Sequence, residues 1–386
     1  MANAGSSSVE HNGASASSTT PSPMLMAAPM TGSANPAASL HSLWSYMTPA
    51  LDYILCSPCN ISLHDLSFKT PAIDPAYHMG IHTAVYNYYT GTRKHRHDEP
   101  PDQSTPDNPN GFPALMGSEL YTQLDRYFES VVRDILLGAP LEDSELIPYY
   151  VTAYTRYAAG LQAIHRLLNY VNRHYVRREV DDDRGWLRLA DLGPLAEEEV
   201  ISTTKISRNG RSITHLNTLV AAGNQEEARQ QVVRRLRGLR MKELKKWGYV
   251  EGDGAEKLAQ AEQSAEAAST LDRVVPIQSL AYRRWRLDCI EPLLTIPDEG
   301  QKPSTSGGRT RGGRRSTKSP PPTKSPPNAI PKGRLARACK MFFETGTLPM
   351  DDKLRSVQCI RDSFLVCGVR RDVALLKRLE KYLASP

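Results

Sequence analysis

The sequence has no run of 18 apolar residues, so no segment is long enough to cross a bilayer as a helix. No basic segment precedes the first apolar stretch at Met24, which argues against a secretory signal. Its six cysteines are scattered, and a chain of 386 residues does not need disulfides to fold. We therefore expect reduced thiols, a cytoplasmic or nuclear protein, and no membrane partner.

Motifs of catalysis are missing as well. The sequence contains no GxSxG elbow, HExxH pair, P-loop or dinucleotide fingerprint, so we expect no enzyme and no cofactor. Cys56 and Cys59 have no second CxxC to complete a zinc site. His78 and His82 are four residues apart but have no evident third ligand. We therefore expect no metal site.

The net charge of +6 is unevenly distributed. Residues 301–333 carry eight basic side chains and no acidic ones, and their Pro, Gly and Ser content is typical of a linker. Ser319 and Ser325 each precede proline and are candidate phosphorylation sites, where a phosphate would offset part of this charge. The excess charge therefore indicates a basic linker and not a basic globular domain.

Hydrophobic periodicity predicts helices throughout and no strand. Apolar residues recur three or four positions apart from 40 to 54, from 116 to 137 and from about 150 to 179. No segment of useful length alternates with period two. The fold class predicted is all-α, with a disordered N-terminus and long insertions.

Shifts in composition divide the chain into six parts. We predict a disordered tail 1–36, helices within 37–180, a partly helical basic insertion 181–274, one helix in 275–299, the basic linker 300–333, and further helices in 334–386. Within the insertion, residues 225–247 form a basic helix and residues 251–270 a weak helix or linker.

Three sequence words are more specific than this periodicity. They read His78-Met-Gly-Ile-His-Thr-Ala-Val-Tyr-Asn-Tyr-Tyr-Thr90, Gly117-Ser-Glu-Leu-Tyr121 and Asn172-Arg-His-Tyr-Val-Arg-Arg-Glu179. In order and spacing they resemble the N-terminal region of cullins, the scaffolds of multisubunit ubiquitin ligases. Residues 277–293 are similar to the next cullin helix, and residues 334–369 to the start of a second cullin repeat. The resemblance covers roughly 39–180, 275–295 and 334–370.

The resemblance implies a fold, a role and a site. The fold would be a cullin-repeat helical bundle that stacks as a solenoid. The role would be a non-catalytic scaffold that docks an F-box adaptor subunit, and through it F-box proteins, in ubiquitin-dependent degradation. In F-box-class cullins two helices form the docking face, which here implies His78, Ile81, His82 and Val85 on one helix and Tyr149, Tyr150 and Ala153 on the other.

Two departures from the family qualify this reading. The part of a cullin that holds the RING subunit has no counterpart in this sequence, so we expect no RING partner and a chain that sequesters adaptor as a competitor. Histidines at 78 and 82 replace family aromatics, which predicts pH-sensitive docking near pH 6.

Two alternatives stay open. One is a degenerate cullin fragment that does not bind adaptor. The other is a basic nuclear protein that associates weakly with nucleic acid through residues 225–247 and 301–333. Steep salt dependence would distinguish the latter, because contacts to phosphates weaken as salt rises.

Overall fold

The computed structural model describes residues 26–29, 35–56, 70–95, 117–188, 191, 225–295, 333–344 and 349–384. Throughout these residues the regular structure is helical, and the one β-type pairing is an isolated bridge between Met26 and Ile73. The all-α prediction is confirmed. None of the described helices is long and apolar enough to cross a membrane.

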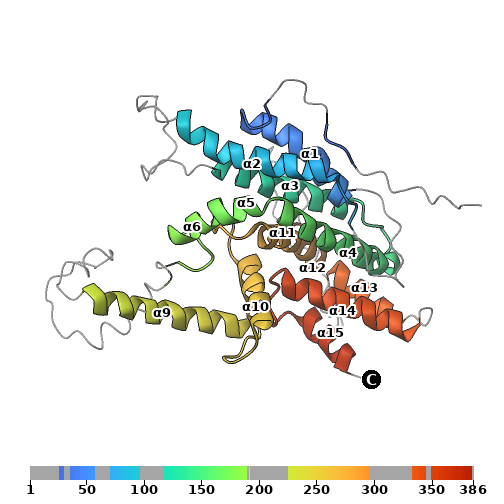
Figure 1. Cartoon of the computed structure of the whole chain (residues 1–386). Helices are drawn as coiled ribbons and strands as arrows, with labels where there is room; N and C mark the ends of the chain where they lie inside the picture. The colour runs from blue at the N-terminus through green and yellow to red at the C-terminus, as the bar shows by residue number, and fades with distance from the viewer. Residues whose placement is uncertain are drawn as a thin grey trace, which may run out of the picture.

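Figure 1 shows the helices as a stack with α4 near its centre. They are α1 (Leu40–Cys56), α2 (Pro75–His95), α3 (Ser118–Leu137), α4 (Asp143–Leu167), α5 (Asn169–Val171), α6 (Arg177–Asp181), α9 (Gln225–Lys246), α10 (Ala255–Ala268), α11 (Ile277–Trp285), α12 (Glu291–Leu294), α13 (Arg334–Glu344), α14 (Met350–Val366) and α15 (Ala374–Ala384). Two π-helices, η1 (Asn172–Val176) and η3 (Arg286–Ile290), connect α5 to α6 and α11 to α12.

The start and end of α3 follow from its sequence. Leu120, Leu124 and Phe128 recur every four residues and are fully buried, so they form a core-facing stripe. The helix ends at Gly138, whose N–H donates to the carbonyl of Asp134 at 3.0 Å, and Pro140 follows two residues later. This places the C-terminal end of α3 beside the start of α4.

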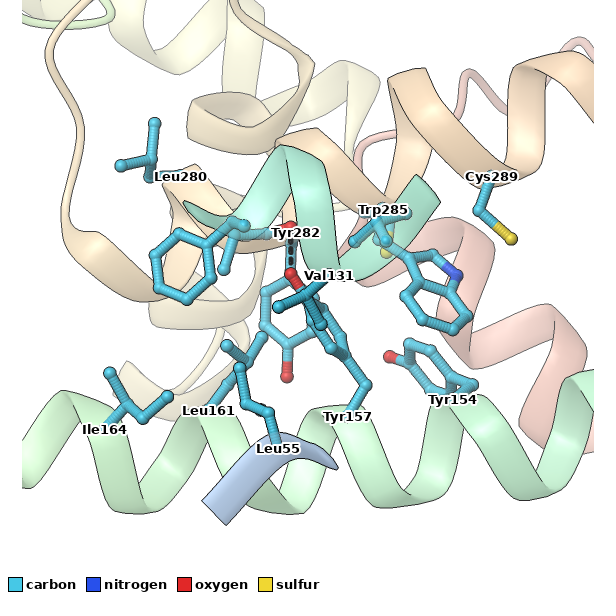
Figure 2. Close-up of a cluster of buried hydrophobic side chains, with 14 of the residues drawn as sticks. Leu55, Val131, Tyr154, Tyr157, Leu161, Ile164, Leu280, Tyr282, Trp285 and Cys289 are labelled. Carbon is cyan, nitrogen blue, oxygen red and sulfur yellow. Dashed lines mark hydrogen bonds between the residues drawn. The ribbon is translucent and has the colours of Figure 1, made fainter. Parts of the chain in front are cut away.

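The centre of the core is an aromatic cluster around Trp285 at the end of α11. Its ring centroid lies 4.8 Å from that of Tyr157 and 5.5 Å from that of Tyr154, both on α4, as Figure 2 shows. The Tyr157 hydroxyl donates to the carbonyl of Ala281 at 3.0 Å. These contacts join α4 to α11, two helices separated by more than 100 residues of sequence.

The long helix predicted from about 150 to 179 is interrupted. It ends at Leu167, because Leu168 leaves the helical conformation with φ −106° and ψ 22°, and the chain continues through α5, η1 and α6. Asn172 in η1 accepts a hydrogen bond from the Ile277 N–H at 2.9 Å through its side-chain oxygen. The interruption therefore brings the second half of the predicted helix against the start of α11.

Helices α13 and α14 both pack against α4. At the start of α13, Arg334 and Arg337 pair with Asp143 of α4 at 3.2 and 3.0 Å. The backbone at Gly333 touches that at Leu294, so closely that a Cβ on Gly333 would lie 2.1 Å from the Leu294 carbonyl oxygen. The assignment of 334–386 to a second repeat stays a prediction, but its helices share one core with α4.

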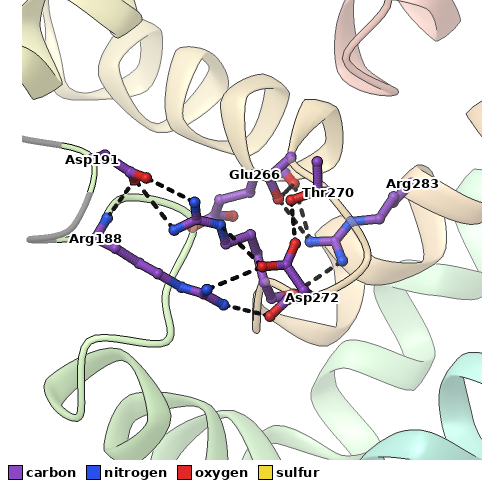
Figure 3. Close-up of polar contacts among 8 residues, drawn as sticks. Arg188, Asp191, Glu266, Thr270, Asp272 and Arg283 are labelled. Atoms are coloured by element: carbon purple, nitrogen blue, oxygen red, sulfur yellow. Dashed lines mark hydrogen bonds and ion pairs between the residues drawn. The ribbon is translucent and has the colours of Figure 1, made fainter. Parts of the chain in front are cut away.

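Residues 251–270, predicted as weak helix or linker, contain the well-packed helix α10. Its buried residues are small, namely Ala261, Ser264, Ala265 and Ala267, and small side chains let its backbone approach α11 closely. The connection from α10 to α11 is fixed by the polar network of Figure 3, in which Arg188 pairs with Asp272 at 3.0 Å and Arg273 with Asp191 at 2.8 Å.

Glu266 of this network titrates far from its usual range. Burial raises the pKa of its carboxyl from 4.5 to about 7, against the opposing effects of the Ser279 hydroxyl, which donates to it at 2.6 Å, and of Arg283 and Arg240. The folded protein therefore holds this proton more tightly than the unfolded chain does. The resulting stability is complete below pH 4.5 and is lost as the pH rises through about 7.

We expect Glu266→Gln to remove this dependence, because glutamine keeps an acceptor for Ser279 and carries no charge. The melting temperature of the variant should match that of the parent at pH 5 and exceed it by a few degrees at pH 8. Thermal denaturation followed by circular dichroism across this pH range measures the difference. Parallel pH profiles of the two proteins would contradict the assignment.

Several predicted features lie outside the described residues. They are most of the tail 1–36, most of the linker 300–333, and the candidate phosphorylation sites Ser319 and Ser325. Within the predicted tail, Met26 is described. It packs against the hydrophobic core, and its carbonyl accepts the N–H of Asp74 at 3.0 Å, which differs from the disorder expected there.

Candidate docking surface

Two residues predicted to face outward on α2 lie in the core instead. Ile81 and Val85 are fully buried, and together with Tyr77 and Tyr88 they form the stripe that α2 presents to the bundle. The prediction of their exposure is wrong because residues spaced four apart along a helix share one face, and this face packs on the bundle. His78 and His82, at the edge of the stripe, are partly exposed.

The predicted residues of α4 are also placed differently from the expectation. Tyr150 and Ala153 are buried, and Tyr150 contacts Trp285 in the core. Tyr149 is half-buried, and its hydroxyl donates to the Ile135 carbonyl at 2.5 Å. The expected outward orientation of these residues is wrong, because α11, α13 and α14 pack against α4.

The structure places α2 against α5, immediately beyond the C-terminal end of α4. The Tyr170 ring of α5 lies 5.3 Å from that of Tyr86 and 6.2 Å from that of His82, both on α2. On its other side Tyr170 stacks on His174 with 4.0 Å between the ring centroids. Tyr149 lies near the start of α4 and Tyr170 just beyond its end, about 20 residues and roughly 30 Å away along the helices. Because α2 meets Tyr170, the predicted docking residues of α2 and those at the start of α4 do not form one face.

We call the set exposed here the α2–α5 surface. It consists of His78, Met79, His82, Tyr86, Tyr170 and His174. Met79 is 59% exposed and Tyr86 47% exposed, which is unusual for large apolar side chains gathered on one side of a helix pair. Tyrosine and methionine are enriched where proteins contact one another.

Two histidines of the α2–α5 surface have a lowered pKa. Burial lowers the pKa of His78, and the neighbouring His82 and Arg166 lower it further. Burial also lowers the pKa of His174, with smaller contributions from Arg178 and Arg173. Both rings are therefore uncharged at neutral pH, and covering them with a partner does not require desolvation of a charge.

Gly80 allows α2 to pack closely on α1. A Cβ at this position would lie 2.3 Å from the hydroxyl oxygen of Tyr46. The Tyr77 hydroxyl in turn donates to the Tyr46 carbonyl at 2.6 Å, so α1 and α2 are held together beside the surface. The glycine costs about 1 kcal/mol of helix propensity relative to alanine but permits this contact.

Sequence reasoning missed four members of the surface, Met79, Tyr86, Tyr170 and His174. The signal was present, because Tyr86 lies four residues after His82 and the word that begins at Asn172 starts two residues after Tyr170. Within the part of the chain that the structure describes, no group of three or more His, Cys, Asp or Glu side chains is arranged to hold a metal ion.

Fold and surface together define an all-α protein with an exposed aromatic patch suited to protein contact.

Parts of the chain are similar in sequence to cullins. It is 27% identical to Cullin-1 of Caenorhabditis elegans over 124 residues, which is 31% of this chain and 16% of that protein. It is 27% identical to Cell division control protein 53 of Saccharomyces cerevisiae over 151 residues, 38% of this chain and 17% of that protein.

A third relative is Cullin-1 of Dictyostelium discoideum, 26% identical over 110 residues. The three matches span 14% to 17% of the relatives' lengths. No protein-family model and no solved structure matches the chain. The comparisons therefore support a relationship to cullins over about a third of the chain.

Proposed function

We propose that this chain is a non-catalytic, scaffold-type protein that docks an F-box adaptor subunit through the α2–α5 surface. One observation carries the proposal. The sequence words at 78–90 and 172–179, the most specific points of resemblance to cullins, are about 90 residues apart. The fold brings them together at one exposed patch, where His82 and Tyr86 meet Tyr170 beside His174.

The chemistry of the patch agrees with this role. Tyr86 and Met79 offer large apolar area to a partner, and such anchors carry most of the binding energy at protein interfaces. The neutral rings of His78 and His174 permit a dry contact. A chain that occupies the adaptor at the position where a cullin binds also competes with that cullin, so competition provides a readout of docking.

The test is calorimetric titration of the full chain with a purified adaptor–F-box protein pair. We expect a dissociation constant below about 1 μM. The double variant Met79→Glu, Tyr86→Glu should weaken binding at least 100-fold, about 2.7 kcal/mol, because two carboxylates would be desolvated at the contact. Both side chains are exposed, so the variant should remain folded.

Leu141→Glu is the control, because Leu141 is 94% exposed and lies two residues before the start of α4, far from the α2–α5 surface, and it should bind as the parent does. Ile81 and Tyr150 are unsuitable for this test since both support the core. A folded parent chain that shows no binding at tens of micromolar would refute docking and leave the degenerate-fragment reading.

A further inference from the structure

Helix α9 projects from the bundle. Figure 1 shows it (yellow) extending away from the other helices, with α10 as its neighbour. Among its residues 233–246, whose side chains are described, only Leu244 is buried. A helix that buries one side chain in almost four turns contributes little to the core, so its surface is free for another purpose.

The exposed side chains of α9 are strongly basic. Residues 233–246 include one acid, Glu243, and seven basic residues, namely Arg234, Arg235, Arg237, Arg240, Lys242, Lys245 and Lys246. Lys246 pairs with Glu243 at 2.5 Å, and Arg240 pairs with Glu262 of α10. Within the described part of the chain, no ion pair involves Arg234, Lys242 or Lys245.

The attachment of α9 fixes the direction of this charge. At 100° per residue, Arg234, Lys242 and Lys245 fall within about 80° of one another on the helix. Arg240, which pairs with Glu262 of α10, lies about 120° or more around the helix from each of them. These three exposed cations therefore form one basic face, about 17 Å long, that points away from α10.

A groove of about 670 Å³ lies at the C-terminal end of α9. Its lining includes Trp247 and Arg371, and also Arg286, which pairs with Glu291 of the same lining. The Arg371 guanidinium donates to the Trp247 carbonyl at 3.1 Å, which fixes the end of α9 beside the turn before α15. The basic face thus leads to a groove of mixed charge whose flat apolar element is the indole ring of Trp247.

We propose that α9 and this groove bind single-stranded nucleic acid. The basic face would follow the phosphates, and a base would enter the groove and stack on Trp247. A line of cations that ends at an aromatic platform is the arrangement that single strands require, since phosphates supply charge and bases supply flat apolar faces. This inference is independent of adaptor docking and concerns a different helix of the fold.

Other anionic partners fit less well. A membrane surface needs an apolar face opposite the charges, whereas α9 buries Leu244 in the bundle and has Arg240 beside it. A rigid duplex could follow the phosphate-binding face, but its stacked bases would not reach the groove. Trp247 therefore distinguishes a single strand from both.

The experiment titrates the full chain into a fluorescein-labelled oligouridine of about 20 nucleotides and measures anisotropy. A DNA strand of the same length, a duplex and phosphatidylserine vesicles are titrated in parallel. We expect micromolar binding to both single strands at about 50 mM salt. Between about 50 and 200 mM salt, log Kd should rise with log salt at a slope near 2, as about three phosphate contacts predict.

The variant Arg234→Glu, Lys242→Glu, Lys245→Glu should raise Kd at least about 30-fold and flatten the salt slope by about 2. Its matched control reverses three arginines of the basic linker, Arg309, Arg311 and Arg314, with the same change in net charge. The control should stay within about threefold of the parent. Trp247→Leu should weaken binding about tenfold, and Trp247→Phe should restore most of it.

Equal losses in the α9 and linker variants would overturn the proposal, because binding would then follow net charge alone. Tighter binding to the duplex or the vesicles than to oligouridine, or an unchanged Kd in Trp247→Leu, would overturn it as well. Circular dichroism confirms that each variant is folded. The α9 variants should bind adaptor as the parent does, which separates this test from that of docking.

Discussion

Trp285→Ala is expected to destabilise the protein by about 3–5 kcal/mol, since truncation of a buried tryptophan removes its burial energy and leaves a cavity. Trp285 is fully buried and contacts three tyrosine rings of α4. Its indole N–H also donates to the Tyr150 hydroxyl at 3.2 Å. A loss of this size is a large part of the total stability of a typical domain.

Chemical denaturation followed by circular dichroism measures this loss. Trp285→Phe should retain part of the stability, because phenylalanine fills some of the space but cannot donate to Tyr150. Trp247→Ala is the control, since Trp247 is partly exposed in the groove and should cost much less. A midpoint for Trp285→Ala within about 1 kcal/mol of the parent would show that the cluster does not organise the core.

Arg283→Met is expected to cost about 3 kcal/mol or more, because it leaves buried polar groups without a partner. Arg283 is 1% exposed. It donates to the Arg273 carbonyl at 3.0 Å and to the Ser269 hydroxyl at 2.8 Å. Within the described residues it forms no ion pair with a carboxylate. Methionine would keep the volume but none of these hydrogen bonds.

Removal of Arg283 has a second, distinguishable effect. Its positive charge lowers the pKa of Glu266, so its loss should move the pH dependence of stability above pH 7. Denaturation at several pH values measures both effects. Arg234→Met, at an exposed position of α9, is the control and should change stability by less than about 0.5 kcal/mol. Equal stabilities of the two variants would contradict the role assigned to Arg283.

Much of the fold could be predicted from local pattern. The stripe of Leu120, Leu124 and Phe128 placed α3 correctly, because a helix that packs on one side repeats its apolar residues every three or four positions. The end of α4 could not be predicted, since Leu168, Val171 and Tyr175 continue the same spacing beyond Ile164. A π-helix adds a residue to a turn without changing the composition, so periodicity alone does not reveal it.

The candidate surface was only half predictable. His78 and His82 were found from their sequence word, but Ile81 and Val85 were assigned to the wrong face. Their spacing with Tyr77 and Tyr88 is that of a buried stripe, a signal that outweighs analogy. Which part of α4 lies near α2 depends on tertiary packing, and no local pattern carries that information. The packing of α10 was missed for a related reason, because a helix rich in alanine shows little hydrophobic contrast.

The contact between Gly333 and Leu294 bears on how the length of the segment between them affects the stability of the protein. The chain leaves α12 and re-enters at α13 at the same point, so this segment has no distance to span. Between ends held this close, the length of a connecting segment changes stability through ring-closure entropy, and shortening residues 296–332 to about six residues is expected to change stability by about 1.6 kcal/mol. A protease cut within it would leave two pieces that still share one core, and a permuted chain with its ends there would keep every helix contact.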